Sequence, residues 1–251
     1  MSRLERVRSE FVASWHSFLR RRTAVFFTFF FPAIIVVIFG ALVQTQPTGG
    51  GLFAEPKEYY IAGYLAVVVL FTPLSRVGST IARHRDGNRF EKLATTPLSR
   101  SEWLLAHSLV NVVVIGLAAL LLLGLSVVVT GASIPLSPAT LALVPFIALG
   151  VTLFCGLGAI IGSLAGSQDG VIAASNAIAL PLLFLSETFV TPELLPAWFQ
   201  PALNLSPLTF FARGVRALTY SGGAWALDLL ILAALAGAFF VVGTLAIPQT
   251  D

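Results

Sequence analysis

The chain has 251 residues, of which 57% are hydrophobic and only 11% are charged, with a net charge of +3. A water-soluble domain carries about 25% charged residues, so the composition excludes that class and indicates a membrane protein. The apolar stretches are continuous and reach the roughly 20 residues that a spanning helix needs, whereas a β-barrel would show alternating segments of roughly ten residues. The sequence therefore predicts an all-α, polytopic membrane protein. Cys155 is the single cysteine, which excludes a disulfide within the chain.

Residues 1–23 are predicted to form an amphipathic helix in the cytoplasmic membrane interface. Its apolar side chains recur at three- and four-residue steps and so share one helix face. In this interpretation Trp15 and Phe18 insert into the membrane. Two roles fit the pattern, a simple anchor or a lever that moves with a cytoplasmic partner. The apolar positions are Leu4, Val7, Phe11, Trp15, Phe18 and Leu19.

Residues 24–251 are predicted to form one transmembrane domain of six helices. In the fourth helix, Gly158, Gly162 and Gly166 recur every four residues, which places them on nearly one face and allows another helix to approach closely. Packing within the chain is the favoured interpretation of this face, and a subunit interface is the alternative. The six predicted spans are 24–45, 59–82, 104–130, 139–165, 171–190 and 226–247.

The basic residues predict the orientation of the chain. Twelve of the fifteen Lys and Arg residues precede the first span or lie between the middle of the second span and the start of the third. Basic residues concentrate on the cytoplasmic side of membrane proteins. We therefore expect both termini and the 83–103 loop to be cytoplasmic, and we expect the protein to lie in the plasma membrane.

The 83–103 loop contains a second amphipathic element. Gly87 and Pro97 bracket a short helix-compatible run, and Ser99 with Glu102 forms a capping box that starts the next helix. The pattern predicts a helical turn that exposes Phe90 and Leu93 among charged residues. A solvated loop would not need this apolar pair, whereas a docking site for another protein would use it. The residues alone leave both interpretations open.

Residues 91–102 resemble the first cytoplasmic loop of ABC-2 type permeases, the membrane subunits of one class of ATP-driven transporters. In that family the loop is a coupling helix that fits a groove in the ATP-hydrolysing subunit. The resemblance implies that ATPase coupling involves Asn88, Arg89, Phe90, Glu91, Lys92 and Leu93.

A second resemblance to the same family lies in residues 185–216, after the fifth span. Apolar pieces that are too short to span, separated by prolines, fit a re-entrant segment that dips into the outer interface and returns. This segment is expected either to close the outer end of a translocation path or to form a static lid. Its candidate residues are Pro192, Pro196, Trp198, Asn204, Pro207 and Arg216.

Three polar residues within the spans are candidates for a translocation path, because ionisable and polar groups in a membrane are costly and often functional. They are Asn111, Asn176 and Glu187. Hydrogen bonds between helices would also explain the asparagines, and solvation at the interface would explain Glu187.

Catalysis by this chain is not expected. It lacks a P-loop, a His-Glu-x-x-His motif and a Gly-x-Ser-x-Gly motif. His16, His84 and His107 are scattered, so neither a metal site nor a cofactor is predicted, and no nucleic-acid partner is expected.

The resemblance instead implies a permease subunit of an exporter in the lipid bilayer. It would form a homodimer or pair with a second permease, and it would bind a separate ATPase. A stand-alone secondary transporter is the alternative. That class often shows inverted repeats, which the sequence does not display.

Overall fold

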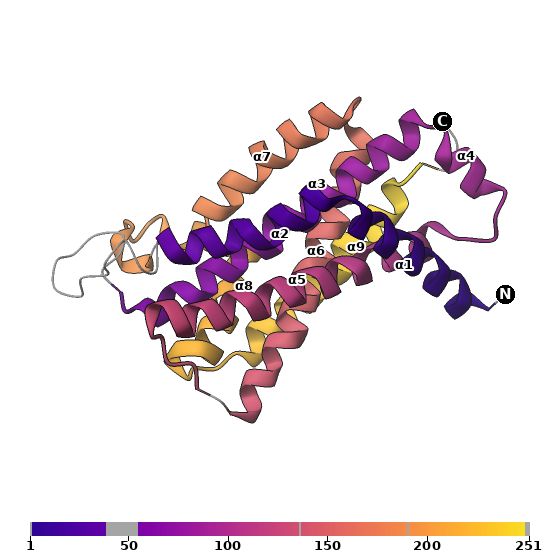
Figure 1. Ribbon diagram of the computed structural model, residues 1–251. Coiled ribbons are helices and arrows are strands. Elements are labelled where there is room, and N and C mark those ends of the chain that lie inside the picture. Colours follow the sequence, from indigo (N-terminus) through magenta and orange to yellow (C-terminus); the bar gives the residue numbers. More distant parts are fainter. Residues whose placement is uncertain (1, 39–54, 136, 190, 249–251) are drawn as a thin grey trace.

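The computed structural model describes residues 2–38, 55–135, 137–189 and 191–248, and within these ranges every regular element is a helix (Figure 1). The all-α prediction is confirmed. The longer helices are α1 (Arg3–Arg20), α2 (Arg22–Ile35), α3 (Ile61–Asp86), α4 (Arg89–Ala94), α5 (Arg100–Thr130), α6 (Leu143–Leu164), α7 (Gln168–Phe184), α8 (Pro207–Arg216) and α9 (Ala226–Ala246). The short helical turns are η2 (Lys57–Tyr60), η3 (Pro138–Ala142), η4 (Pro192–Leu194), η5 (Gln200–Leu205) and the π turn η6 (Ala217–Ser221).

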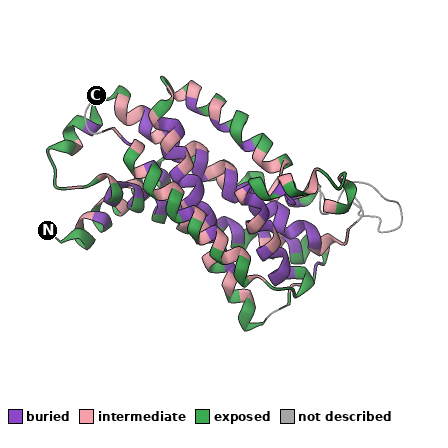
Figure 2. Ribbon diagram, turned by 180° about the vertical axis from the view of Figure 1, so that it is seen from behind, coloured by how far each residue is buried: buried purple, intermediate pink, exposed green. Residues whose placement is uncertain are grey.

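Helix α3 forms the centre of an elongated bundle. It packs against α5, α6, α7 and α8, and all residues from Ile61 to Leu70 are buried. Helix α6 lies between α3 and α9. Figure 2 shows many exposed residues on the outside of the bundle. The outer helices α5 and α9 keep large apolar side chains on the surface, such as Leu120 and Leu230. Lipid tails are as apolar as leucine, so this surface is the one expected for a bundle that lies in a bilayer.

Four helical segments in the described part of the chain are long and apolar enough to cross a membrane. They are Lys57–Asp86, Arg100–Thr130, Pro138–Leu164 and Ala226–Ala246, and the bent pair α1–α2 would make a fifth. Helix α7 is apolar but has 17 residues. The six-span count therefore stays a prediction. The ends of two predicted spans, 39–45 and Val190, lie outside the described residues.

The segment after α7 consists of elements that are too short to span. η4, η5, the ten-residue α8 and η6 follow one another before α9 begins. Pro192 and Pro207 each stand at the start of a helix, where a missing N–H donor costs nothing. Helix α8 buries Leu208, Phe211 and Val215 against its neighbours α3, α6 and α9. Whether this segment re-enters the membrane stays a prediction.

Helix α1 does not use its apolar face in the predicted way. Phe18 is buried beneath the Arg76 guanidinium, whose carbon lies 4.2 Å from the ring centroid, and Trp15 is half-buried. Leu4 and Leu19, by contrast, are exposed. The expectation that Phe18 inserts into the membrane is wrong, because α1 packs against α5 and brings this ring onto α3.

The glycine face of α6 serves packing within the chain. A Cβ atom on Gly158 would lie 2.4 Å from the Leu74 carbonyl oxygen, and one on Gly162 would lie 2.5 Å from the Gly78 carbonyl oxygen. Helices α3 and α6 thus touch backbone to backbone at these positions. Gly166 has no atom within 4 Å of its Cβ position and takes no part in the contact. The favoured interpretation is confirmed for the first two glycines only.

This contact generates a stability prediction. Gly162→Ala should destabilise the protein by about 1–3 kcal/mol, because the added methyl group meets backbone that must shift. Gly116→Ala on α5 is the matched control, since its Cβ position is open. The control should be neutral or stabilising by about 1 kcal/mol through helix propensity. Thermal unfolding in detergent checks this, and equal effects of the two variants would contradict the proposed α3–α6 contact.

Candidate functional site

The turn between α3 and α4 consists of two residues and changes the direction of the chain. Helix α3 ends at Asp86, and Gly87 follows as its C-cap. Asn88 then adopts a left-handed conformation with φ of 49°, which asparagine tolerates better than most residues. The backbone N–H of Asn88 donates to the Arg85 carbonyl over 2.9 Å. Because α4 starts directly after this turn, its direction relative to α3 is fixed.

Phe90 anchors α4 to the bundle. Its side chain is 4% exposed, and its ring contacts His84 and Trp103 with centroid distances of 5.6 and 5.9 Å. Trp103 in turn lies 4.0 Å from the His107 ring. The expectation that Phe90 is exposed is wrong, because aromatic partners on α3 and α5 offer it an apolar contact that water does not. Leu93 is half-buried against the same core.

The opposite face of α4 is free for a partner. Arg89, Glu91, Lys92 and Ala94 are exposed, as is Asn88 before the helix. Beside them, an open hollow of about 600 Å³ lies between α4, the start of α5 and the end of α9. Its walls are largely apolar and include Phe90, Leu93, Ala94, Leu98, Trp103, Leu245 and Ile247. This end of the bundle therefore combines charged side chains with an apolar recess.

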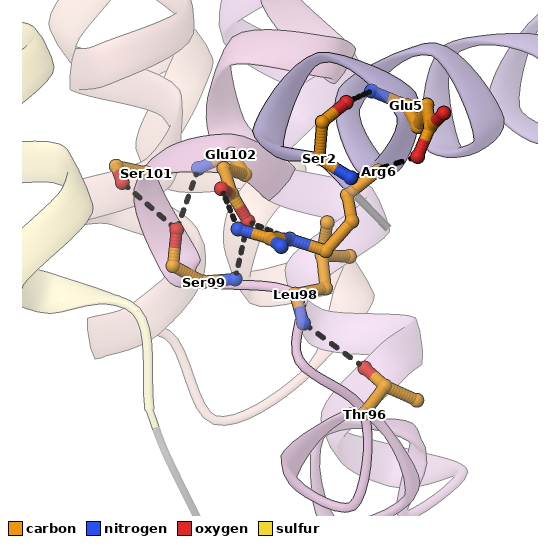
Figure 3. Close-up of polar contacts among 8 residues, drawn as sticks. All are labelled: Ser2, Glu5, Arg6, Thr96, Leu98, Ser99, Ser101 and Glu102. Carbon is orange, nitrogen blue, oxygen red and sulfur yellow. Dashed lines mark hydrogen bonds and ion pairs between the residues drawn. The ribbon is translucent and has the colours of Figure 1, made fainter.

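Glu102 joins the end of this loop to α1 (Figure 3). Ser99 and Glu102 form the predicted capping box: the Glu102 N–H donates to Ser99 Oγ over 3.3 Å, and the Ser99 N–H donates to Glu102 Oε2 over 3.0 Å. The same carboxylate accepts hydrogen bonds from Arg6 Nε at 3.0 Å and Arg6 Nη2 at 2.6 Å. Two-point binding of this kind fixes orientation as well as distance. One carboxylate thus joins α1, the loop and the start of α5.

A second set of polar contacts joins α1 to α5 further along the helices. His107 Nε2 lies 3.2 Å from Glu10 Oε1, and His107 Nδ1 lies 3.3 Å from Ser14 Oγ. The Asn111 amide donates to the His107 carbonyl over 2.8 Å and accepts from Arg76 Nη1 over 3.3 Å. The bond from Arg76 joins α3 to α5, as one of the two sequence interpretations expected, whereas the bond to His107 lies within α5.

The other end of the bundle holds a cluster around Glu187. Arg213 Nε donates to the Glu187 carboxylate over 2.8 Å, and Arg213 Nη1 donates to Asn204 Oδ1 over 2.8 Å. Arg216 Nη2 donates to the Glu187 backbone carbonyl over 2.5 Å, and its guanidinium carbon lies 3.7 Å from the Tyr59 ring centroid. The bond to Glu187 raises the pKa of Arg213, whereas burial lowers the pKa of Arg216. Glu187 is buried, so an ion pair compensates its charge in place of water.

The structure brings together some of the predicted outer residues and separates others. Glu187, Asn204 and Arg216 meet in one cluster, and Pro207 begins α8 beside it. Trp198 is 80% exposed, and Pro196 is exposed as well.

The three predicted path residues do not meet. Asn111 is buried between α3 and α5, and Asn176 is exposed on α7. Glu187 belongs to the outer cluster. Within the described ranges, no group of three or more His, Cys, Asp or Glu residues is placed to hold a metal ion.

Sequence reasoning missed the α1 residues that make these contacts. Arg6, Glu10 and Ser14 follow one another at four-residue steps and so share a helix face. This polar face could have been recognised beside the apolar one. Its partners, Glu102 and His107, lie more than 90 residues away and could not have been identified.

Comparisons with known proteins agree on one class. The family model described as ABC-2 type transporter matches residues 6–220, which include α4 and the Glu187 cluster. The daunorubicin resistance ABC transporter permease protein DrrB1 of Streptomyces coeruleorubidus is 28% identical over 190 residues, covering 72% of this chain. The putative transport permease ycf38 of Porphyra purpurea is 25% identical over 207 residues, covering 77% of this chain. Each alignment covers 66% of the relative's length.

The Glu102 junction generates a prediction about the mobility of α1. Glu102→Gln removes the charge that Arg6 binds, while glutamine can still complete the capping box. Amide hydrogen exchange in residues 3–20 should therefore become faster, with the start of α5 little changed. Glu91→Gln, which alters an exposed carboxylate on α4, should leave the exchange of α1 unchanged. Unchanged exchange of α1 in Glu102→Gln would show that Arg6 does not hold this helix.

Proposed function

Because the chain belongs to the ABC-2 type transporter family, we propose that it is the membrane half of an ATP-driven exporter and that it binds a separate ATPase subunit. The chain is a multi-pass membrane permease of an ABC transporter. Members of this family are transport subunits and not enzymes, so the chemical energy has to come from a partner.

In the proposed arrangement α1 and α4 lie on the cytoplasmic side of the plasma membrane. The concentration of Lys and Arg before α2 and around α4 supports this orientation. Helix α1, within the predicted interfacial segment of residues 1–23, then lies in the interface and rests on the transmembrane domain predicted for residues 24–251. Both termini are cytoplasmic in this arrangement.

The ATPase docks on the exposed face of α4. Asn88, Arg89, Glu91 and Lys92 provide its polar rim, and Leu93 borders the apolar hollow next to α5 and α9. Phe90 has a different role from the one that the resemblance implied. It holds α4 against Trp103 and so positions the docking face. The observation that carries this proposal is a short helix that is fixed on one face and free on the other.

Movement of the ATPase would reach the bundle through two connections. The first is the aromatic contact from Phe90 to Trp103 on α5, and the second is the Glu102 carboxylate, which binds Arg6 on α1. Both connections reach α5 in its first turn, at Trp103 and at Glu102. A force on α4 would therefore move α1 and α5 together.

The translocation path is proposed to run between two permease subunits, either identical or paired. Asn111, Asn176 and Glu187 are candidate path residues only if the subunits rearrange, because the present contacts satisfy two of them. Glu187, Asn204, Arg213 and Arg216 would hold the outer segment closed. The apolar, aromatic helices favour a lipophilic cargo, and one relative is named for daunorubicin resistance.

A stand-alone secondary transporter is the competing function. Such a carrier would translocate its substrate without an ATPase, and it would need ion or proton sites in the membrane. The match to the ABC-2 family over residues 6–220 favours the ATP-driven class.

Filling the hollow beside α4 tests the docking site. Ala94 is exposed and lines the hollow, so Ala94→Trp should leave the fold intact while it blocks access. We expect the amount of P-loop ATPase that copurifies with the tagged chain to fall at least tenfold, because a misfitted side chain costs an interface more than about 1.4 kcal/mol. Size-exclusion chromatography of the variant checks that it is folded.

Ala197→Trp is the matched control. Ala197 is also exposed, but it lies in the segment between η4 and η5 at the other end of the bundle. This variant should retain the ATPase. Recovery of the ATPase by a folded Ala94→Trp protein at the level of the control would contradict docking at α4.

A further inference from the structure

Three consecutive arginines form the elbow between α1 and α2. Arg20 ends α1, Arg21 stands between the two helices, and Arg22 begins α2. The axes of the two helices differ by 81°, so when α2 crosses a membrane, α1 runs along its surface. The elbow then lies where the polar headgroups begin. All three arginine side chains are exposed, and none pairs with a carboxylate in the described part of the chain.

The elbow borders a shallow, open hollow of about 680 Å³. The three arginines, Thr23, Ala24 and Phe27 line it. Its lining therefore combines cationic side chains with an aromatic ring and a methyl group. A ligand that fits both has a negatively charged group joined to an apolar part.

The exposed face of α2 continues the apolar side of this hollow. Phe26, Phe27, Phe30 and Phe31 have between 44% and 57% of their surface exposed, and the rings of Phe26 and Phe30 stack at 4.5 Å. In a bilayer this aromatic face contacts acyl chains directly below the headgroup level. A phospholipid could place its phosphate in the hollow, at the headgroup level, and its acyl chains along the aromatic face of α2.

The local charge favours an anion at this place. Arg21 interacts unfavourably with Arg76 and Arg83 of α3, which are themselves partly buried. The described carboxylate nearest in sequence to the elbow on α1 is Glu10, and it faces His107. A bound phosphate would offset this repulsion. Basic residues next to a membrane contribute about fivefold each to the binding of anionic lipid.

We infer that the Arg20–Arg22 elbow is a binding site for the headgroup of an anionic phospholipid whose acyl chains lie along the phenylalanines of α2. The bound lipid holds the elbow at the membrane surface. Since α1 is joined to α5 through Glu102 and His107, the lipid also restrains the helices next to α4. This site requires the membrane location of α2 but not the ATPase, so it can be tested on the chain alone.

The test uses the full chain in bilayer discs made from equal parts of phosphatidylcholine and phosphatidylglycerol. Native mass spectrometry after release from the discs gives the ratio of phosphatidylglycerol-bound to phosphatidylcholine-bound protein. Arg21→Gln/Arg22→Gln should lower this ratio about tenfold or more. Arg21→Lys/Arg22→Lys, which keeps both charges, should retain most of the preference.

Two controls identify the ligand and the place. Arg3→Gln/Arg8→Gln removes the same charge from exposed positions at the start of α1, which do not line the hollow, and should lower the ratio much less. An excess of soluble glycerol phosphate should not displace the lipid, because it lacks the acyl chains that contact α2. An equal fall of the ratio in the two glutamine variants would overturn the proposal, since the preference would then follow net charge alone. Displacement by glycerol phosphate would overturn it as well, by assigning the elbow to a soluble anion.

Discussion

At the end of the bundle around α4, the carboxylate of Glu102 joins three parts of the chain: α1, the loop after α4 and the start of α5. Glu102 accepts two hydrogen bonds from Arg6 and one from the Ser99 backbone, and it stands in the first turn of α5. A negative charge is favourable there because the first N–H groups of a helix carry a partial positive charge. The Glu102 carboxylate therefore both caps the start of α5 and holds the first turns of α1 beside the loop that follows α4.

Charged contacts occur at both ends of the molecule, while its centre is apolar. Around α3 the packing is mainly apolar, with direct backbone contact through Gly158 and Gly162, and Arg76 is the charged exception. At the far end, Glu187 and two arginines join the segment after α7 to α8. This distribution suits a membrane protein, because polar pairs at the ends avoid the cost of burying charge in hydrocarbon.

The sequence predicted the features that depend on local pattern. The long apolar runs became helices close to their expected bounds, as α3 and α5 show, and the Ser99–Glu102 capping box formed as expected. The glycine spacing in α6 correctly indicated close helix packing. The capping box and the glycine spacing involve residues that are close in sequence, and the helices follow from long apolar runs that are typical of membrane proteins.

The wrong predictions concern short or amphipathic helices, where the sequence did not show which face packs against the rest of the protein. Helix α4 has six residues, so its pattern could not show that Phe90 turns towards Trp103 on α5. The apolar stripe of α1 fitted lipid and protein equally, because both are apolar, and Phe18 in fact packs beneath Arg76. The partner of Arg6 lies 96 residues away, and no local signal marks such a contact.

Site-specific photo-cross-linking tests most directly the proposed contact between the exposed face of α4 and the ATPase. A photoreactive amino acid would replace the exposed Lys92 on α4 or, in a parallel sample, the exposed Glu193 in η4. After illumination in native membranes, the account predicts that the chain labelled at position 92 is covalently joined to a P-loop ATPase and that the chain labelled at position 193 is not. A cross-link to the ATPase from position 193, with none from position 92, would contradict it.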